Sequence, residues 1–246
     1  MNAIQALLAL GLVTAVPASQ PGLGPAEVAA AERKFADARR QLVRSIRGYT
    51  GPIRERPDPR ILRVIGEVPR HLLIPESQRA FAYRNEALPI GEDQTISQPS
   101  LVALMTHLLR PEDDDVVLEV GTGSGYQAAI LARLVDRVYT IEIVEPLARQ
   151  AARRMADLGY ANVTVRHGDG YAGWPEHAPF DGIIVTAGAP HVPKPLLDQL
   201  KPGGRMVIPV GAAGTIQQLK LIKKNPRGRV MEEEIVPVRF VPLTRK

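Results

Sequence analysis

The chain of 246 residues contains no cysteine, and aromatic residues make up only 4% of it. Without cysteine, the chain has no disulfide, no thiolate metal ligand and no thiol nucleophile. With so few aromatic rings, alanine, valine and leucine must supply most of the core packing. The hydrophobic fraction of 45% is ordinary for a globular protein, and a chain of this length can bury a sizeable core without covalent staples.

A strong charge of one sign is also missing, since the net charge is only +5. A basic balance can indicate a nucleic-acid partner. Here the arginines between residues 33 and 60 are interleaved with prolines and acidic residues, and few aromatic side chains accompany them. This pattern favours a solvated surface, and we expect no nucleic-acid partner.

No Lys or Arg precedes the apolar run at residues 3–16, which Pro17, Ala18 and Ser19 follow. The run and the small residues after it resemble the apolar region and cleavage site of a signal peptide, but the basic start of such a peptide is absent. The run is also too short to span a bilayer comfortably. We interpret residues 1–25 as a signal-like or flexible segment and expect a cytoplasmic protein without stable membrane association. Export to the periplasm is the alternative.

The remaining chain changes character near residue 99. Before it, the sequence predicts a helix at 26–48, a loop at 49–60, a helix at 59–67 and an irregular, proline-punctuated segment at 68–99. Long irregular segments in compact domains are often functional. After it, helices are expected at 99–109, 126–134, 146–158 and 195–199, and strands at 116–120, 138–143, 163–167, 180–186, 205–210, 217–223 and 233–240. This alternation predicts an α/β fold with a doubly wound, mostly parallel, seven-stranded sheet.

The sequence V-L-E-V-G-T-G-S-G-Y at residues 117–126 leads an apolar strand into alternating glycines and then a helix. Glycine lets the backbone approach a ligand closely, and a helix start offers free N–H groups. The dinucleotide fingerprint G-x-G-x-x-G would need glycine at Tyr126. The observed spacing, with Glu119 upstream, better fits S-adenosylmethionine, whose ammonium Glu119 could bind. We therefore predict Gly121, Thr122, Gly123, Ser124 and Gly125 as cofactor-binding residues in a Rossmann-like class I methyltransferase fold. Dinucleotide binding and a purely structural turn are the alternatives.

Two further acidic residues follow the next two strands. Glu142 ends the second strand about 20 residues after the glycines, a spacing at which a carboxylate can accept both ribose hydroxyls. Asp169, in H-G-D-G, ends the third strand, where it could hold an adenine amino group while Gly170 lets the backbone turn beneath the ring. Ligands in such sheets bind at the carboxyl ends of the strands. The two acids therefore join Glu119 in the predicted cofactor site.

The glycine loop predicts the methyl donor and does not indicate which group accepts the methyl. The fourth strand ends in Thr186-Ala187-Gly188-Ala189-Pro190, unlike the N-P-P-Y or D-P-P-Y clusters of amino-directed nucleic-acid methyltransferases, and C5-cytosine chemistry needs a cysteine. Base methylation thus loses support. His71 and His191 are isolated histidines near prolines, without metal-ligand spacing to a second ligand. We interpret them as surface or loop packing residues and predict no metal site.

Several blocks closely resemble the protein-L-isoaspartate (D-aspartate) O-methyltransferase family, within about residues 60–243. They are V-P-R-H-L-L-I-P-E (68–76), A-Y-R-N-E-A-L-P-I-G (82–91), Q-T-I-S-Q-P (94–99), the glycine block, H-G-D-G-Y-A-G-W (167–174), F-D-G-I-I-V-T-A-G-A-P (180–190) and V-R-F-V-P-L (238–243). Q-T-I-S-Q-P is specific to this family rather than to methyltransferases at large. Residues 1–50 lie outside this resemblance and inherit nothing from it.

The resemblance implies S-adenosylmethionine-dependent methylation of the carboxylate of L-isoaspartyl residues in damaged proteins and peptides, as a repair reaction. It implies that Ser97 is the active-site serine and that Thr95, Ile96, Gln98, Val238 and Phe240 are substrate-binding. Residues 26–246 would form one methyltransferase domain, with a substrate side at 26–99 and a cofactor core at 100–246. We expect a monomer. Methylation of another protein or small-molecule carboxylate, and a non-enzymatic cofactor-binding module, are the alternatives.

The chemistry of a carboxylate acceptor fits this residue set. A carboxyl group has a pKa near 4, so it is ionised at neutral pH and can attack a methyl group without a general base. Ser97 would then orient the acceptor by hydrogen bonding. The residue pattern alone leaves a structural alternative, in which Ser97 caps the helix that begins at Pro99.

Overall fold

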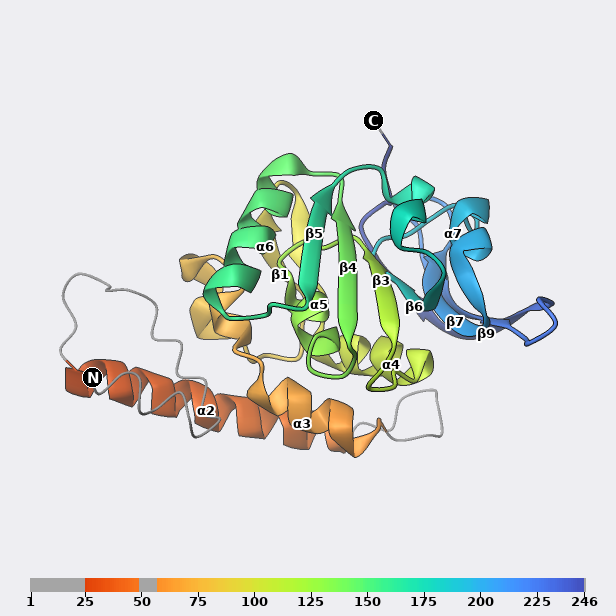
Figure 1. Ribbon diagram of the computed structural model, residues 1–246. Coiled ribbons are helices and arrows are strands. Elements are labelled where there is room, and N and C mark those ends of the chain that lie inside the picture. The colour runs from red at the N-terminus through yellow and green to blue at the C-terminus, as the bar shows by residue number, and fades with distance from the viewer. Residues whose placement is uncertain (1–24, 49–56, 246) are drawn as a thin grey trace, which may run out of the picture. The chain divides into compact units, whose positions relative to one another are not determined.

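The computed structural model describes residues 25–48 and 57–245 (Figure 1). The expected signal-like segment before Pro25 and most of the loop expected at 49–60 lie outside these residues. The chain divides into two compact units, 1–34 and 35–246. In the first unit, residues 25–34 are helical and mostly exposed, and they begin α2 (Pro25–Arg47), whose remainder belongs to the second unit.

The second unit contains a seven-stranded sheet (Figure 1). Its strands are β3 (Val116–Val120), β4 (Arg137–Glu142), β5 (Val163–His167), β6 (Phe180–Val185), β7 (Leu200–Val210), β8 (Gln217–Lys224) and β9 (Val230–Val238). The order is β5-β4-β3-β6-β7-β8-β9; pairs from β5 to β7 are parallel, and β8 and β9 add antiparallel strands. The predicted doubly wound, mostly parallel sheet is therefore confirmed. The strand order reverses between β3 and β6, which is where such sheets bind ligands.

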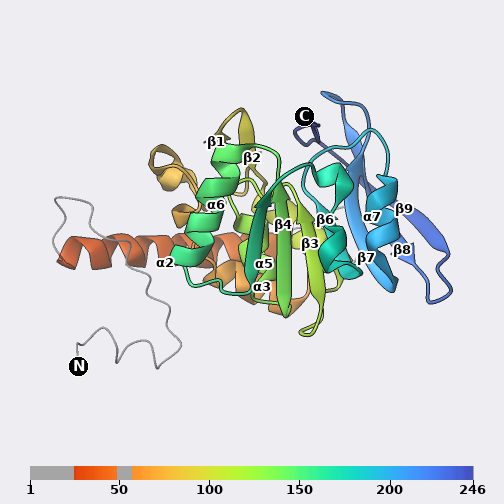
Figure 2. The same ribbon diagram turned by 45° about the horizontal axis from the view of Figure 1, so that its top comes forward.

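The helices cover both faces of this sheet. They are α3 (Pro59–Glu67), α4 (Pro99–Leu109), α5 (Tyr126–Leu131), α6 (Glu145–Asp157) and α7 (Lys194–Gln199). Figure 2 shows α6 beside the β5 end of the sheet and α7 beside β7. Along β3, Val117 packs into the core shared with α4 and α5, whereas Leu118 packs into the core shared with α7. Neighbouring residues thus face opposite cores, so this central strand is buried on both faces.

The segment at 68–99 is more regular than the sequence predicted. It contains two 3₁₀ helices, η2 (Arg70–Leu72) and η3 (Glu76–Phe81), and an antiparallel hairpin of β1 (Leu88–Gly91) and β2 (Gln94–Ile96). Two further 3₁₀ helices, η4 (Gly170–Ala172) and η5 (Pro175–His177), follow β5. Hairpin strands this short present almost no alternating pattern, which is why the sequence did not reveal them.

Several predicted boundaries were wrong. β9 begins at Val230 rather than at residue 233, and α5 ends at Leu131 rather than at residue 134. β7 begins at Leu200 rather than at residue 205, because Leu200 pairs with Phe180 before the chain bulges through the Pro-Gly-Gly sequence and pairs again at Arg205. β9 ends at Val238 rather than at residue 240. Phe240 leaves the ladder because its backbone N–H donates to the side chain of Gln217.

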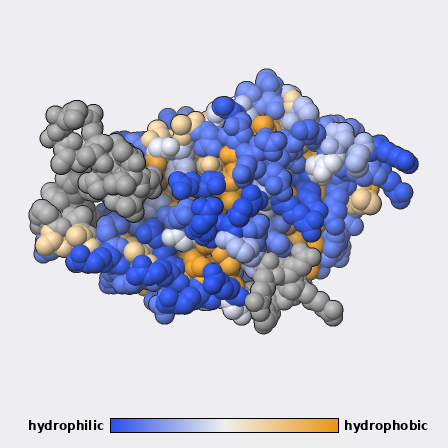
Figure 3. All heavy atoms as spheres, turned by 60° about the horizontal axis from the view of Figure 1, so that its bottom comes forward, coloured by the Kyte–Doolittle hydropathy of each residue, from blue (hydrophilic) through white to orange (hydrophobic). Residues whose placement is uncertain are grey.

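The surface in Figure 3 is largely hydrophilic, with smaller hydrophobic areas between charged side chains. Over residues 25–48 and 57–245, we found no helix of the length and apolarity needed to cross a membrane.

Candidate functional site

The glycine loop after β3 is held close to two neighbouring strands. The Gly121 N–H donates to the Ile141 carbonyl of β4 at 2.8 Å, and the Thr186 hydroxyl after β6 donates to the Gly121 carbonyl at 2.5 Å. Gly121 has φ +98°, and an added Cβ would lie 2.5 Å from the Thr186 hydroxyl oxygen. Only glycine fits this conformation and spacing without displacing its neighbours.

Glu142 at the end of β4 ties the loop to its own strand. Its Oε2 accepts from the Gly123 N–H at 2.7 Å, and its Oε1 accepts from the Val144 N–H at 3.0 Å. The side chain is buried. Its orientation is therefore fixed by backbone groups, while each carboxylate oxygen retains a second lone pair for a ligand hydroxyl.

Glu119, the penultimate residue of β3, is fully buried. Its Oε2 accepts from the Thr140 hydroxyl at 2.6 Å, and the Thr140 and Thr122 hydroxyl oxygens lie 2.6 Å apart. Its Oε1 has no hydrogen-bond partner within the described ranges. Burial raises the pKa of Glu119 to about 8, against the opposing effect of the Thr140 hydrogen bond and with a smaller upward contribution from Glu142. Glu119 is thus a protonatable group with one oxygen available to a ligand.

A cavity of about 760 Å³, open to solvent, lies at the carboxyl ends of β3, β4 and β6. The predicted residues of the glycine loop and of β2 lie around this cavity, together with Glu119 and Glu142. Its lining comprises Gln94–Ser97, Val102, Glu119–Ser124, Tyr126, Gln127, Ile141–Val144, Gly170, Thr186, Ala187 and Val241–Thr244.

Two predicted cofactor residues lie outside this lining. Gly125, at φ +87°, is the N-cap of α5, and an added Cβ there would lie 2.8 Å from the Met155 side chain. Asp169 is the N-cap of η4, and its carboxylate accepts from the Tyr171 N–H at 2.9 Å. The local role visible for Gly125 is close packing on α6, and that for Asp169 is fixing the turn that carries Gly170.

A second open cleft, of about 1270 Å³, lies between the start of α4 and the chain around the end of β9. It is lined mainly by apolar side chains, and it includes the predicted residues Gln98, Val238 and Phe240. Thr95, Ser97, Thr186 and Val241 line both this cleft and the first cavity. The two spaces therefore meet at three hydroxyl-bearing residues and one valine.

The alternative role of Ser97 as a helix cap was wrong. The N-cap of α4 is Gln98, which makes no side-chain capping bond. The Asn85 side chain instead accepts from the Ser100 N–H at 2.9 Å. Asn85 thus binds the first turn of α4, and the half-buried Ser97 lines both spaces.

Sequence reasoning missed several residues of this site. Thr186 looked like one of the small residues that end β6, and its partner Gly121 lies far away along the chain. Arg70, from the block at 68–76, is fully buried with its guanidinium carbon 4.6 Å from the centre of the Tyr126 ring. Burial lowers the pKa of Arg70 to about 10, and its Nε donates to the Ala82 carbonyl. A buried arginine that packs under the first residue of α5 leaves no local sequence signal.

The two isolated histidines have packing roles. His71 is buried rather than at the surface: it stacks on Phe35 at 4.0 Å between ring centres, and its Nδ1 lies 2.7 Å from the Tyr83 hydroxyl. Burial, with Arg39 and Arg79 nearby, lowers its pKa to about 4. His191 is exposed, with its ring 6.4 Å from that of Tyr171.

Relatives of one description match most of this chain. The family model described as protein-L-isoaspartate(D-aspartate) O-methyltransferase matches residues 43–246. The resemblance therefore begins upstream of residue 60, and the expectation that it excludes all of residues 1–50 was wrong for 43–50. The chain is 56% identical to protein-L-isoaspartate O-methyltransferase 2 of Syntrophobacter fumaroxidans over 222 residues, which cover 88% of this chain and 90% of that protein. It is 60% identical to the enzyme of the same description from a Polaromonas species, over 82% of this chain and 95% of that protein.

Solved structures share this fold. A protein-L-isoaspartate O-methyltransferase, 30% identical, superposes with a TM-score of 0.73 over 83% of this chain and 65% of its own. A putative enzyme of the same description from Plasmodium falciparum, solved with S-adenosyl-L-homocysteine, superposes with a TM-score of 0.70 at 24% identity, covering 85% of this chain and 99% of its own. On the strength of the family match and the close relatives, the chain belongs to the protein-L-isoaspartate(D-aspartate) O-methyltransferase family.

Proposed function

We propose that this chain transfers a methyl group from S-adenosylmethionine to the carboxylate of L-isoaspartyl residues in damaged proteins and peptides. The observation that carries the proposal is the junction at Ser97, where the cavity that contains the glycine loop, Glu119 and Glu142 meets a cleft lined mainly by apolar side chains. A methyl donor in the first space and a peptide in the second would bring their reacting groups together at this junction.

The residues of the first cavity fit this donor. The available oxygen of buried Glu119 suits the ammonium of the methionyl part, and the Glu142 carboxylate suits the ribose hydroxyls. Gly121 keeps the loop free of a Cβ where the backbone comes closest to Thr186. Gly170 is restricted in the same way, because an added Cβ would lie 2.3 Å from the Val120 side chain. Thr122, Gly123 and Ser124 complete the wall beside these residues.

The residues around Ser97 need only position and partly desolvate the acceptor. When bound, the donor supplies a methyl group on a positively charged sulfur that departs as a neutral thioether. The acceptor carboxylate is already ionised, so no general base is required. Ser97 can donate a hydrogen bond to one carboxylate oxygen and leave the other facing the cavity. Orientation and exclusion of water then supply the catalysis.

The peptide would bind along the second cleft. Val238 and Phe240 form one wall, and Thr95 and Gln98 flank Ser97 on the other side. Ile96 lines only the first cavity. The peptide residues on either side of the isoaspartyl residue would lie against apolar surface. Recognition of the peptide would then depend more on the course of its backbone than on the charge of its side chains.

The test measures methyl transfer to a peptide with L-isoaspartate and to the same peptide with normal aspartate. We expect transfer only to the first. If both peptides are ignored while another protein or small-molecule carboxylate is methylated, the proposed acceptor is wrong. Binding of the donor without transfer to any acceptor would favour a non-enzymatic module. A Ser97→Ala variant with full activity would remove Ser97 from the mechanism.

We further propose a cytoplasmic monomer, built as one methyltransferase domain over residues 26–246, without a nucleic-acid partner. Ion pairs between exposed arginines and acids, such as Arg63 with Glu67 and Arg149 with Glu145, support the absence of a nucleic-acid surface. Large exposed hydrophobic residues of the described ranges are few, at Ile216, Val230 and Met231, which supports the monomer. Light scattering after size exclusion tests the monomer, and N-terminal sequencing of the mature protein tests export.

A further inference from the structure

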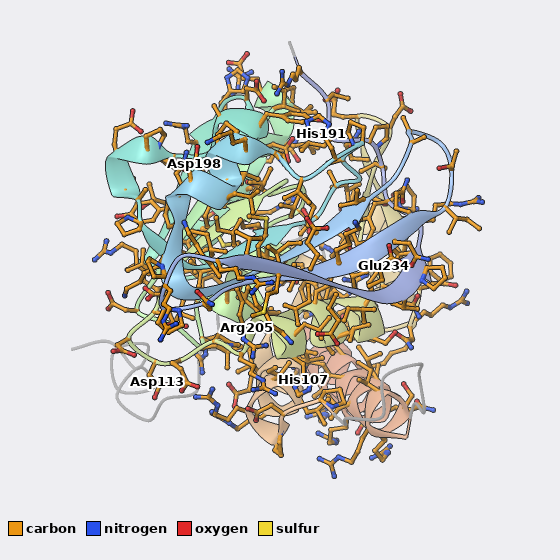
Figure 4. The ribbon with its side chains drawn as sticks, turned by 90° about the vertical axis from the view of Figure 1, so that its right-hand side faces the viewer. His107, Asp113, His191, Asp198, Arg205 and Glu234 are labelled. Atoms are coloured by element: carbon orange, nitrogen blue, oxygen red, sulfur yellow. The ribbon has the colours of Figure 1, made fainter. Side chains whose placement is uncertain are left out.

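Two buried glutamines outside the lining of the cavity and the cleft each hold a segment that forms part of a wall. Gln199 is 8% exposed at the end of α7, and Gln217 is 1% exposed at the start of β8. Figure 4 shows Asp198, on α7, well apart from Glu234, on the edge strand β9. Gln199 follows Asp198 on α7, and Gln217 begins β8, the partner of β9.

Gln199 binds the turn that follows the third parallel strand. Its Oε1 accepts from the Trp174 N–H at 2.7 Å, and its Nε2 donates to the Ala172 carbonyl at 2.8 Å. The fit is close, because a Cβ on Gly173 would lie 2.2 Å from the Gln199 Oε1. Both ends of the amide are therefore used to fix one short piece of backbone.

That piece of backbone continues η4, whose first residue is Gly170 in the wall of the cofactor cavity. Gly170 has no room to shift toward β3, since even an added Cβ would lie 2.3 Å from the Val120 side chain. A turn that moved on loss of Gln199 would carry Gly170 out of the cavity wall. The consequence would be confined to the cofactor side.

Gln217 binds the chain after β9 in a similar way. Its Oε1 accepts from the Phe240 N–H at 2.8 Å, and its Nε2 donates to the Thr215 carbonyl at 2.9 Å. Phe240 and Val238 line the cleft. The residues beyond Phe240 are held by Gly188, whose N–H donates to the Val241 carbonyl and whose carbonyl accepts from the Leu243 N–H, both at 2.8 Å. Gly188 packs on the Gln217 side chain, since an added Cβ there would lie 3.1 Å from it, and a leucine of similar volume keeps this packing.

We propose that Gln199 and Gln217 are positioning residues for methyl transfer, with Gln199 setting the cofactor wall and Gln217 setting the peptide wall. This inference rests on the proposed function. Neither side chain lines the cavity or the cleft, so each acts through the backbone it holds. A leucine of similar volume would leave two backbone groups unpaired at each position, and such groups are costly when buried.

The test compares steady-state kinetics of Gln199→Leu and Gln217→Leu with an isoaspartyl peptide and S-adenosylmethionine. We expect Gln199→Leu to raise the KM for the methyl donor about tenfold or more and to leave the peptide KM nearly unchanged, because small displacements of positioning groups have effects of this size. We expect Gln217→Leu to give the reverse pattern. Gln150→Leu, at an exposed position on α6, serves as the control and should change neither KM.

Equal effects of the two leucine variants on both KM values, or a loss of stability alone with both KM values unchanged, would overturn the inference. If a leucine variant does not fold, Gln199→Glu and Gln217→Glu take its place, since each retains an acceptor for the Trp174 or Phe240 N–H. A smaller effect in the same direction is then expected, and its absence counts against the inference. Failure of the wild-type chain to methylate the peptide would instead contradict the proposed function.

Discussion

Glu119 is the residue whose charge should depend most on the ligand. Its pKa is raised from 4.5 to about 8 because burial penalises the carboxylate. Glu142 faces it with a second negative charge, while the Thr140 hydroxyl donates to it and the Thr122 hydroxyl extends that pair. Between pH 4.5 and 8 the folded free protein therefore holds a proton that the unfolded chain has lost. The free energy of unfolding of the free protein therefore falls as pH rises through this window.

We predict that cofactor binding releases this proton, because an ammonium beside Glu119 favours the carboxylate. The affinity for S-adenosylhomocysteine should rise with pH up to about 8, by at most about tenfold per pH unit. Calorimetry at pH 7 in buffers of different ionisation enthalpy measures the released proton directly. Glu119→Gln, which cannot ionise, should bind more weakly and release none. Equal proton release from both proteins would contradict the assignment.

Gly121 allows a matched comparison of strain and steric clash. Gly121→Ala places a side chain at φ +98° and 2.5 Å from the Thr186 hydroxyl oxygen, whereas Gly203→Ala introduces similar strain at φ +91° into open space. Both should lose about 1 kcal/mol of stability through strain. Only Gly121→Ala should also lose cofactor affinity, measured by calorimetry with S-adenosylhomocysteine. Equal affinity in the two variants would mean that Thr186 yields without disturbing the cavity.

The start of α4 is the element that sets the position of Ser97. Asn85→Ala removes the acceptor of the Ser100 N–H, and loss of such a capping bond costs about 1 kcal/mol. We expect a lower melting temperature and a raised peptide KM. Asn225→Ala is the control, because Asn225 accepts from the Arg227 and Arg229 N–H groups in the turn after β8. The control should lose stability with an unchanged peptide KM. If the two variants have the same peptide KM, the start of α4 does not set the position of Ser97.

Helices and strands with a strong local sequence pattern were predictable. Elements that depend on contacts between residues far apart in the sequence were not. The buried strands β3 and β6 are apolar runs bounded by turn residues, so their positions followed directly. The strand-end location of Glu142 followed in the same way from β4. The hairpin of β1 and β2 was not predicted, because its turn places Glu92 and Asp93 at φ +53°, where glycine or asparagine would normally give the signal.

The same limit applies to the site. Glu119 and the glycines were identifiable because their spacing lies within one strand, loop and helix. Thr186 and Asn85 act on partners 65 and 15 residues away, and only the packed fold brings them together. Asp169 was placed correctly at the end of β5, but its visible bond is to the Tyr171 N–H rather than to the cavity. The position of Asp169 after β5 was predictable from the sequence. The direction of its carboxylate was not.

For the whole molecule, the described sites depend on the second compact unit alone. The lining of the cofactor cavity begins at Gln94, and that of the cleft begins at Ile46, so both lie within residues 35–246. We predict that a chain without residues 1–34 retains kcat and both KM values within about twofold, since changes distant from a site are usually independent of it. Phe35, which stacks on His71, must remain in that chain.

The matched control for this deletion is the Phe35→Ala variant of the full chain. It removes the half-buried ring that stacks on buried His71 and should lower the melting temperature, because stacked aromatic rings contribute to stability. If the deletion behaves as expected, the shortened and full chains give the same kinetics while the Phe35→Ala chain is less stable than either. A tenfold rise in the peptide KM on deletion would instead mean that residues 1–34 take part in substrate binding, and the functional unit would then have to include them.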